Sequence, residues 1–186
     1  TADVSLRDVN LKFGDDLPTL ELERMSGRLQ ASFPADGLAV KGQEVALLSR
    51  TAVRGPDGDE SPIRIDPADF EVEWRAGRET GIRTGSAGVS RLDLGALARL
   101  AAYLPFDARL RQLLEDYAPR GQVSALSARW SGDAEKLHVY SLKTGIQNLG
   151  ARAKGYFPGF SGFTGAFEAT EKGGKAVLHS EGASID

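Results

Sequence analysis

The sequence contains one strand-like pattern twice, once near each end of the chain. Residues 25–32 (MSGRLQAS) and residues 163–170 (FTGAFEAT) share the order apolar, hydroxyl, Gly, any residue, apolar, Gln or Glu, Ala, hydroxyl. The match continues without a gap, so residues 38–47 align with residues 176–185. Each copy is typical of two strands joined by a turn, which Gly173 and Gly174 are expected to form in the second copy. A chain that reuses a hairpin usually stacks its copies into an extended sheet. The alternative is chance similarity, because any two alternating strand pairs share a period of two residues.

The alternation of apolar and polar residues is clearest in the segment around residue 72. Phe70, Val72 and Trp74 share one face of this segment, and Glu71 and Glu73 share the other. Most other strand-like segments also have one apolar and one polar face, which is typical of an antiparallel sheet covered on one side only. The sequence therefore predicts a mainly β protein whose twisted antiparallel sheet has one apolar face.

The middle of the sequence changes from a strand period to a helix period. Apolar residues recur at helical spacing in residues 94–104 and again in residues 110–117. Asp93 suits an N-cap position, and Pro105 is expected to end the first helix. We therefore expect a helical pair, inserted at about residues 93–118 between two β-rich halves.

Composition and chain ends limit the class of protein further. With 41% hydrophobic and 26% charged residues, the chain can form a core and is not disordered by composition. A formal net charge of -3 argues against a nucleic-acid partner. No stretch is apolar for long enough to form a transmembrane helix, and the first residues lack the features of a signal peptide. Because strand-like patterns begin and end the sequence, we expect residues 1–186 to be a single segment of a longer repeating β-sheet protein.

No pattern in the sequence indicates catalysis, a cofactor or a metal site. The acidic stretch 57–60 (DGDE) lacks the complete spacing of a calcium loop, and His138 and His179 are not spaced as metal ligands. The serine in residues 159–162 (GFSG) does not fit a nucleophile elbow, and the glycine-rich residues 81–88 lack a Walker lysine and are interpreted as a loop. We therefore expect a protein that is not an enzyme.

The order of several turn and helix signatures resembles that of a known family. No single signature is specific, but their order and spacing together cover nearly the whole chain. They comprise residues 17–18 (LP), 26–29 (SGRL), 92–105 (LDLGALARLAAYLP), 119–121 (PRG), 130–132 (WSG), 157–162 (FPGFSG) and 168–174 (EATEKGG). In this respect the chain resembles the YhdP-like proteins of the AsmA-like group of bacterial envelope proteins.

The resemblance implies a fold, a location and a role. Members of that family are much longer than this chain, with an N-terminal membrane anchor in the inner membrane and a long periplasmic body. That body is a repeating, twisted β-sheet that forms a trough with an apolar interior. The implied role is transport of phospholipid between the inner and outer membranes, in support of the outer-membrane barrier. The chain would then be a periplasmic segment of the conduit, joined to adjacent segments and to an anchor that lies outside it.

A lipid conduit of this kind requires a continuous apolar stripe that contacts phospholipid acyl chains. The alternating strands supply candidates for that stripe. The lipid-contacting candidates are Leu29, Ala31, Phe33, Leu38, Val40, Phe70, Val72, Trp74, Leu126, Ala128, Trp130, Phe163 and Phe167. The alternative is that these residues form an ordinary core under the helical pair. The chain would then be a structural or protein-interaction module of an envelope assembly, with a fully plugged sheet.

Overall fold

The computed structural model describes residues 1–56, 58–77, 81–133 and 137–185. Ten strands form one sheet, and two helices lie between the fifth and sixth strands. The elements are β1 (Ala2–Leu11), β2 (Leu20–Ser32), β3 (Gly37–Arg54), β4 (Glu60–Ala76), β5 (Arg83–Asp93), α1 (Leu94–Leu100), α2 (Ala108–Tyr117), β6 (Arg120–Gly132), β7 (Leu137–Ala151), β8 (Phe160–Thr170), β9 (Gly173–Leu178) and β10 (Ser184–Ile185).

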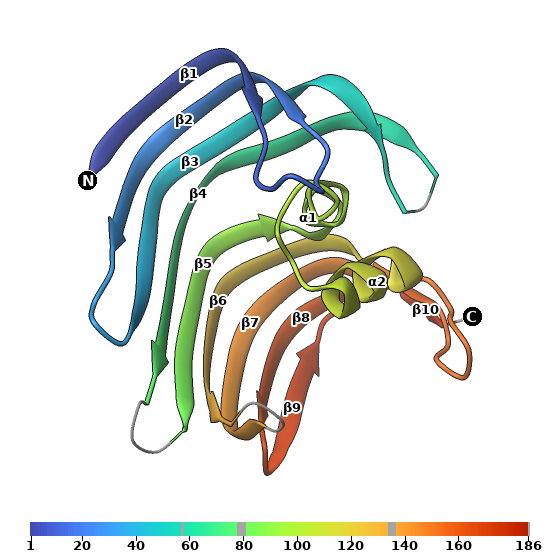
Figure 1. Ribbon diagram of the computed structural model, residues 1–186. Coiled ribbons are helices and arrows are strands. Elements are labelled where there is room, and N and C mark those ends of the chain that lie inside the picture. Colours follow the sequence, from blue (N-terminus) through green and yellow to red (C-terminus); the bar gives the residue numbers. More distant parts are fainter. Residues whose placement is uncertain (57, 78–80, 134–136, 186) are drawn as a thin grey trace.

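The sheet is an antiparallel meander in which strands that are consecutive in the chain are neighbours in space. The order runs from β1 to β8, and the edge beyond β8 is shared by β9 and β10. Figure 1 shows that the strands bend into an open trough and that α1 and α2 lie inside its concave face, over one end of the strands. We call the end of the sheet that contains Leu20, Leu22 and Ile63 the covered half, and the end that contains Val72 and Trp74 the open half. The predicted mainly β fold with an inserted helical pair is confirmed.

Local irregularities at several strands accompany this bending. Asp8, Glu44, Ala125 and Asn148 all have a positive φ, near 50°, although none of them is glycine. Pairing shifts register beside Glu44, Ala125 and Asn148, as expected for β-bulges, which bend and twist the strand that carries them. At Asp8 the ladder between β1 and β2 skips one residue while the flanking register is kept.

Polar side chains satisfy backbone groups that the bulges release from the ladder. The amide of Glu44 donates to Asp69 Oδ1 at 2.8 Å, and the amide of Asn148 donates to Thr164 Oγ1 at 3.1 Å. Each bond replaces a ladder hydrogen bond, so the bend does not leave those donors unpaired. Asp69 and Thr164 therefore stabilise the bulged conformation at these two positions.

Both helices begin at the expected kind of residue. Asp93 Oδ1 accepts a hydrogen bond from the amide of Ala96 at 2.8 Å, which confirms the predicted N-cap, and Asp107 caps α2 in the same way. The helical spacing predicted a first helix as far as Leu104, but α1 ends at Leu100 and the chain continues in turns. Proline disfavours helical geometry at the residue before it. This effect of Pro105 does not by itself explain a helix that ends several residues earlier.

The main hydrophobic core lies beneath α1, in the covered half. Leu20, Leu22 and Ile63 from the sheet pack with Ala96 and Leu100 of the helix. Helix α2 differs, since none of its residues is buried. An aromatic series instead continues from the end of this helix to the sheet, in the order Tyr117, Phe157, Phe160 and Phe163, with successive ring centroids 5.4–6.1 Å apart.

The predicted repeat is found in its first strand. Gly27 in β2 and Gly165 in β8 have φ values of 142° and 156°. Gly165 is paired on both sides, whereas Gly27 pairs with Val4 of β1 and lies at a register shift in the ladder between β2 and β3. A Cβ at Gly27 would lie 2.8 Å from Val45 Cα, and one at Gly165 would lie 2.0 Å from the carbonyl oxygen of Val177. The neighbouring backbone therefore comes too close for any side chain, as expected for a glycine inside a strand.

The gapless continuation of the repeat past its turn is wrong. Leu29 pairs with Gly42 in the first copy, whereas the corresponding Phe167 pairs with Ala176 in the second. The second hairpin is shorter, because its turn is formed by residues 171–172 between the paired Thr170 and Gly173. Gly173 and Gly174, which the sequence suggested as the turn, are instead the first residues of β9.

The glycine-rich stretch at residues 81–88 also differs from its interpretation as a loop. Residues from Arg83 onward belong to β5, which is paired along its length with β4 and β6. Tertiary packing explains the difference, because Gly85 and Gly88 lie under large side chains of the neighbouring strands. Glycine here makes room for those side chains and does not end the strand.

Candidate functional site

The cross-strand register brings most of the predicted apolar residues together on the concave face. Along β2 the concave side continues from Met25, which packs against the core under α1, to Leu29 and Ala31 in the open half. From there the pairing extends in three rows across the strands. These rows are Leu29–Gly42–Phe70–Val89–Leu126, Ala31–Val40–Val72–Ala87–Ala128–Leu142–Ala169 and Leu38–Trp74–Gly85–Trp130–Tyr140.

Two aromatic rings lie over glycines of neighbouring strands on this face. A Cβ added at Gly42 would lie 2.3 Å from the ring of Phe70, and one at Gly85 would lie 2.2 Å from the ring of Trp130. Each ring therefore lies along the floor of the trough instead of standing upright from it, as in the packing of aromatic side chains over strand glycines. This arrangement covers the floor with carbon and leaves space above it.

The open half of the apolar face is accessible to solvent. Val72 is 42% exposed and Trp74 is 39% exposed, although both side chains lie on the concave face, while Ile63 beneath α1 is 0% exposed. Large apolar side chains that stay accessible in a contiguous set usually mark a binding surface. The trough is thus sealed by α1 in its covered half and uncovered in the other.

Two of the predicted residues lie apart from these rows. Phe33 comes after the last residue of β2 and is 79% exposed, so it sits at the rim of the trough and not on its floor. Phe163 belongs to the aromatic series that leads to α2, in the covered half. Phe167 remains on the concave face, because it lies two residues before Ala169, which pairs with Leu142.

Several residues of the rows were not singled out from the sequence. They are Ala87, Val89, Tyr140, Leu142 and Ala169. The glycines around Ala87 and Val89 interrupt the alternating pattern. In residues 137–144 both faces of the strand are partly apolar, so periodicity did not identify the concave face there. The pairing of Ala87 and Leu142 with already recognised neighbours is the signal that identifies them.

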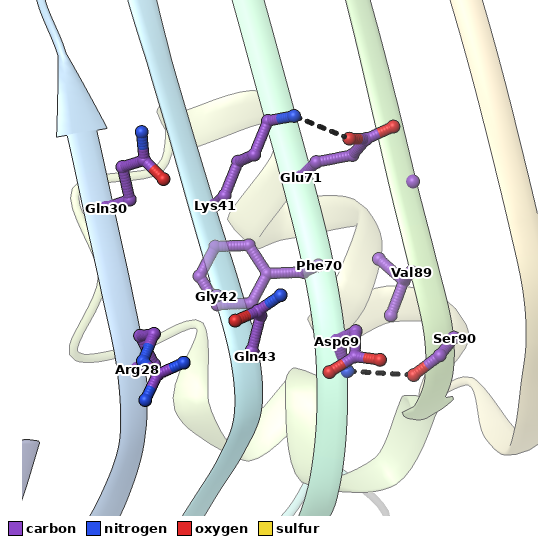
Figure 2. A pocket seen from close by; sticks show the side chains of 11 residues that line it. Arg28, Gln30, Lys41, Gly42, Gln43, Asp69, Phe70, Glu71, Val89 and Ser90 are labelled. Carbon is purple, nitrogen blue, oxygen red and sulfur yellow. Dashed lines mark hydrogen bonds and ion pairs between the residues drawn. The ribbon is translucent and has the colours of Figure 1, made fainter. Parts of the chain in front are cut away.

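The opposite, convex face is polar and largely paired within itself. Figure 2 views it with the helices behind the sheet, around a hollow of about 390 Å³ lined by residues of β2, β3, β4 and β5. Lys41 Nζ lies 3.5 Å from Glu71 Oε2, and the amide of Asp69 donates to Ser90 Oγ at 2.8 Å (Figure 2). Because these groups already have partners, the hollow offers few free groups for a ligand.

Ion pairs elsewhere on the convex face keep its side chains charged. Lys143 Nζ lies 2.7 Å from Glu168 Oε1. The hydrogen bond of this pair and the charge of Lys143 lower the pKa of Glu168 below its ordinary value, and the same hydrogen bond and the charge of Glu168 raise the pKa of Lys143. Both groups therefore remain ionised near neutral pH, which favours hydration of this face.

The other sites considered from the sequence have simple surroundings. His138 Nε2 lies 2.9 Å from Asp133 Oδ2, and Asp59 of the acidic stretch receives two hydrogen bonds from Arg99, whereas Asp57 lies outside the described residues. Across the described ranges, no cluster of three or more His, Cys, Asp or Glu residues is arranged to hold a metal ion. Neither helix in the described part of the chain is long and apolar enough to cross a membrane.

A bent antiparallel sheet with one apolar, partly uncovered face defines the class of this protein as a β-trough. Comparison with protein families then identifies the family, because the sequence model described as YhdP protein matches residues 1–186. The chain belongs to the YhdP family, as its order of turn and helix signatures suggested. No curated protein and no solved structure matches the chain.

Proposed function

We propose that this chain is a segment of an envelope lipid conduit and that the open half of its concave face holds phospholipid acyl chains. The observation that carries the proposal is the set of three apolar rows, which cross the strands without interruption by a charged residue. Membership of the YhdP family supports it. In this proposal the segment lies in the periplasm and is joined to an inner-membrane anchor outside the chain.

The dimensions and energetics of the rows suit an acyl chain. Neighbouring strands are about 4.8 Å apart, so a row from β2 to β8 extends for roughly 30 Å. Acyl chains of one leaflet occupy about half of a hydrocarbon core that is roughly 30 Å thick, so such a row is long enough for one chain. Each methylene removed from water contributes about 0.8 kcal/mol, which favours binding without a specific polar contact.

The alternative function, a structural module with a fully plugged sheet, is favoured by one observation. Helix α1 closes the covered half with a dry core that includes Leu22 and Ile63. That core accounts for only part of the concave face, because Val72 and Trp74 remain accessible beside it. We therefore assign stability to the covered half and lipid contact to the open half.

Photocrosslinking distinguishes a lipid-binding face from a bare one. A photoreactive phenylalanine analogue replaces Val72 on the concave face or, as the matched control, Glu73 on the convex face of the same strand. After irradiation in cells, mass spectrometry is expected to find phospholipid adducts at position 72 and few at position 73, because only the first side chain lies among the apolar rows. Equal adduct yields at the two positions, or none at either, would contradict the proposed function.

A further inference from the structure

A second hollow, rich in arginine, lies at the margin of the covered half. It has a volume of about 690 Å³ and is formed by the loop before β2, the loop after β3, the two helices and the residue that follows β7. The residues that line it are Pro18, Arg54, Gly55, Pro56, Gly58, Ala98, Arg99, Ala101, Ala102, Arg111, Glu115 and Arg152. Ligand sites commonly have volumes of about 300–1,000 Å³, so this hollow is large enough for a small ligand.

The charge of this hollow is opposite to that of the chain as a whole. Four arginines and one glutamate line it, in a protein whose formal net charge is -3. Asp59 compensates one of these cations, because it accepts hydrogen bonds from Arg99 at 2.7 and 2.8 Å. Even with this pair counted, the described residues that line the hollow carry an excess of positive charge.

The four arginines differ in whether the protein already holds their side chains by hydrogen bonds. Arg99 is held by Asp59, and its Nε is buried with no hydrogen-bond partner among the described residues. Arg152 donates to the carbonyl oxygen of Pro56. Arg54 and Arg111 form no ion pair with another described residue, so their guanidinium groups are available to an anion. Two arginines are thus fixed by the protein, and two are free to bind.

We infer that this hollow binds a phosphate group, contacted by Arg54 and Arg111 and oriented by the fixed Arg99 and Arg152. Guanidinium groups match phosphate oxygens with paired hydrogen bonds, and their planar donors make arginine the preferred residue for such anions. The phosphate belongs to a lipid headgroup or to a free phosphate ion, because both present the same oxygens. Glu115, which also lines the hollow, disfavours a ligand that fills the whole hollow with negative charge.

This site is separate from the apolar trough. Ala98, Ala101 and Ala102 of the α1 segment line the hollow, whereas Ala96 and Leu100 pack into the core on the other side of the helix. A phosphate in the hollow therefore does not require an acyl chain in the trough, and the two proposals can fail independently.

Titration calorimetry on paired variants tests the inference. Inorganic phosphate and dihexanoyl phosphatidylglycerol, kept below its micelle concentration, are titrated separately into the protein. The Arg54→Gln/Arg111→Gln variant is expected to bind at least one of them on the order of tenfold more weakly than the unmodified protein. The control, Arg109→Gln/Arg129→Gln, removes the same charge from exposed arginines outside the hollow and is expected to bind as the unmodified protein does.

The pattern of binding also identifies the source of the phosphate. Weaker binding of inorganic phosphate in the hollow variant supports a site for the free ion, and weaker binding of the lipid alone supports a headgroup site. The inference is overturned if the unmodified protein binds neither ligand, or if the two double variants bind equally. Lipid that binds equally to both variants, without phosphate binding, removes this site but leaves the proposed acyl-chain function intact.

Discussion

The Ile63→Ala variant is expected to lose about 2–5 kcal/mol of its free energy of unfolding, the cost of a cavity in a well-packed core. Ile63 is 0% exposed and packs with Leu20 and Leu22 beneath α1, so the removed carbons are not replaced. A loss of this size is a large part of the roughly 5–15 kcal/mol that stabilises a typical domain. Urea denaturation followed by circular dichroism measures it.

The matched control for this variant is Ile185→Ala. Ile185 is 68% exposed in the short strand β10, so the same truncation is expected to cost less than about 1 kcal/mol there. A larger loss of unfolding free energy in Ile63→Ala than in Ile185→Ala would show that the covered half supplies most of the stability. The open half can then remain uncovered. Equal losses in the two variants would show that the core under α1 is not the main source of stability.

The Ala87→Asp variant is expected to reduce the phospholipid recovered with the protein by on the order of tenfold or more, because burying an unpaired carboxylate against an acyl chain is costly. Ala87 lies in the central row of the open half, paired with Val72 and Ala128. Lipid extraction from the purified protein, followed by mass spectrometry, measures the amount recovered.

Ser86→Asp provides a closely matched control in the same strand. Ser86 precedes Ala87 and pairs with Glu73 and Arg129 on the convex face. The Ser86→Asp substitution therefore introduces the same charge on the opposite side of the sheet. Circular dichroism and expression level establish that both variants fold. If a folded Ala87→Asp variant retains as much lipid as the Ser86→Asp variant, the concave face is not the binding surface.

Much of the architecture follows from local sequence patterns. The alternation of Phe70, Val72 and Trp74 identified both a strand and the face that it presents, and Asp93 marked the start of α1. Each of these signals lies within a few residues, so tertiary contacts are not needed to interpret it. The family resemblance extended this interpretation to a trough, and the bent sheet agrees with it.

The predictions that failed depend on contacts between distant residues. The strand around Gly85 exists because its glycines accommodate the ring of Trp130 and other neighbours, which no local pattern records. The register of the second hairpin depends on a two-residue turn at residues 171–172, whereas the glycine pair that follows predicted the turn two residues later. The arginine-lined hollow combines residues from separate loops and helices, so only the folded structure brings Arg54 and Arg111 together.

The most direct test of the central claim is the nuclear Overhauser effect between the acyl-chain protons of a bound phospholipid and the methyl groups of the protein, because this effect requires direct contact. If the open half holds the acyl chain, the methyl groups of Val40, Val72 and Ala87 show cross-peaks to acyl-chain protons. The methyl groups of Ile63, sealed under α1, and of Ala39, which pairs with Glu73 on the convex face, then show none. Cross-peaks to Ala39 as strong as those to Ala87, or no cross-peaks from the open half at all, would contradict the account.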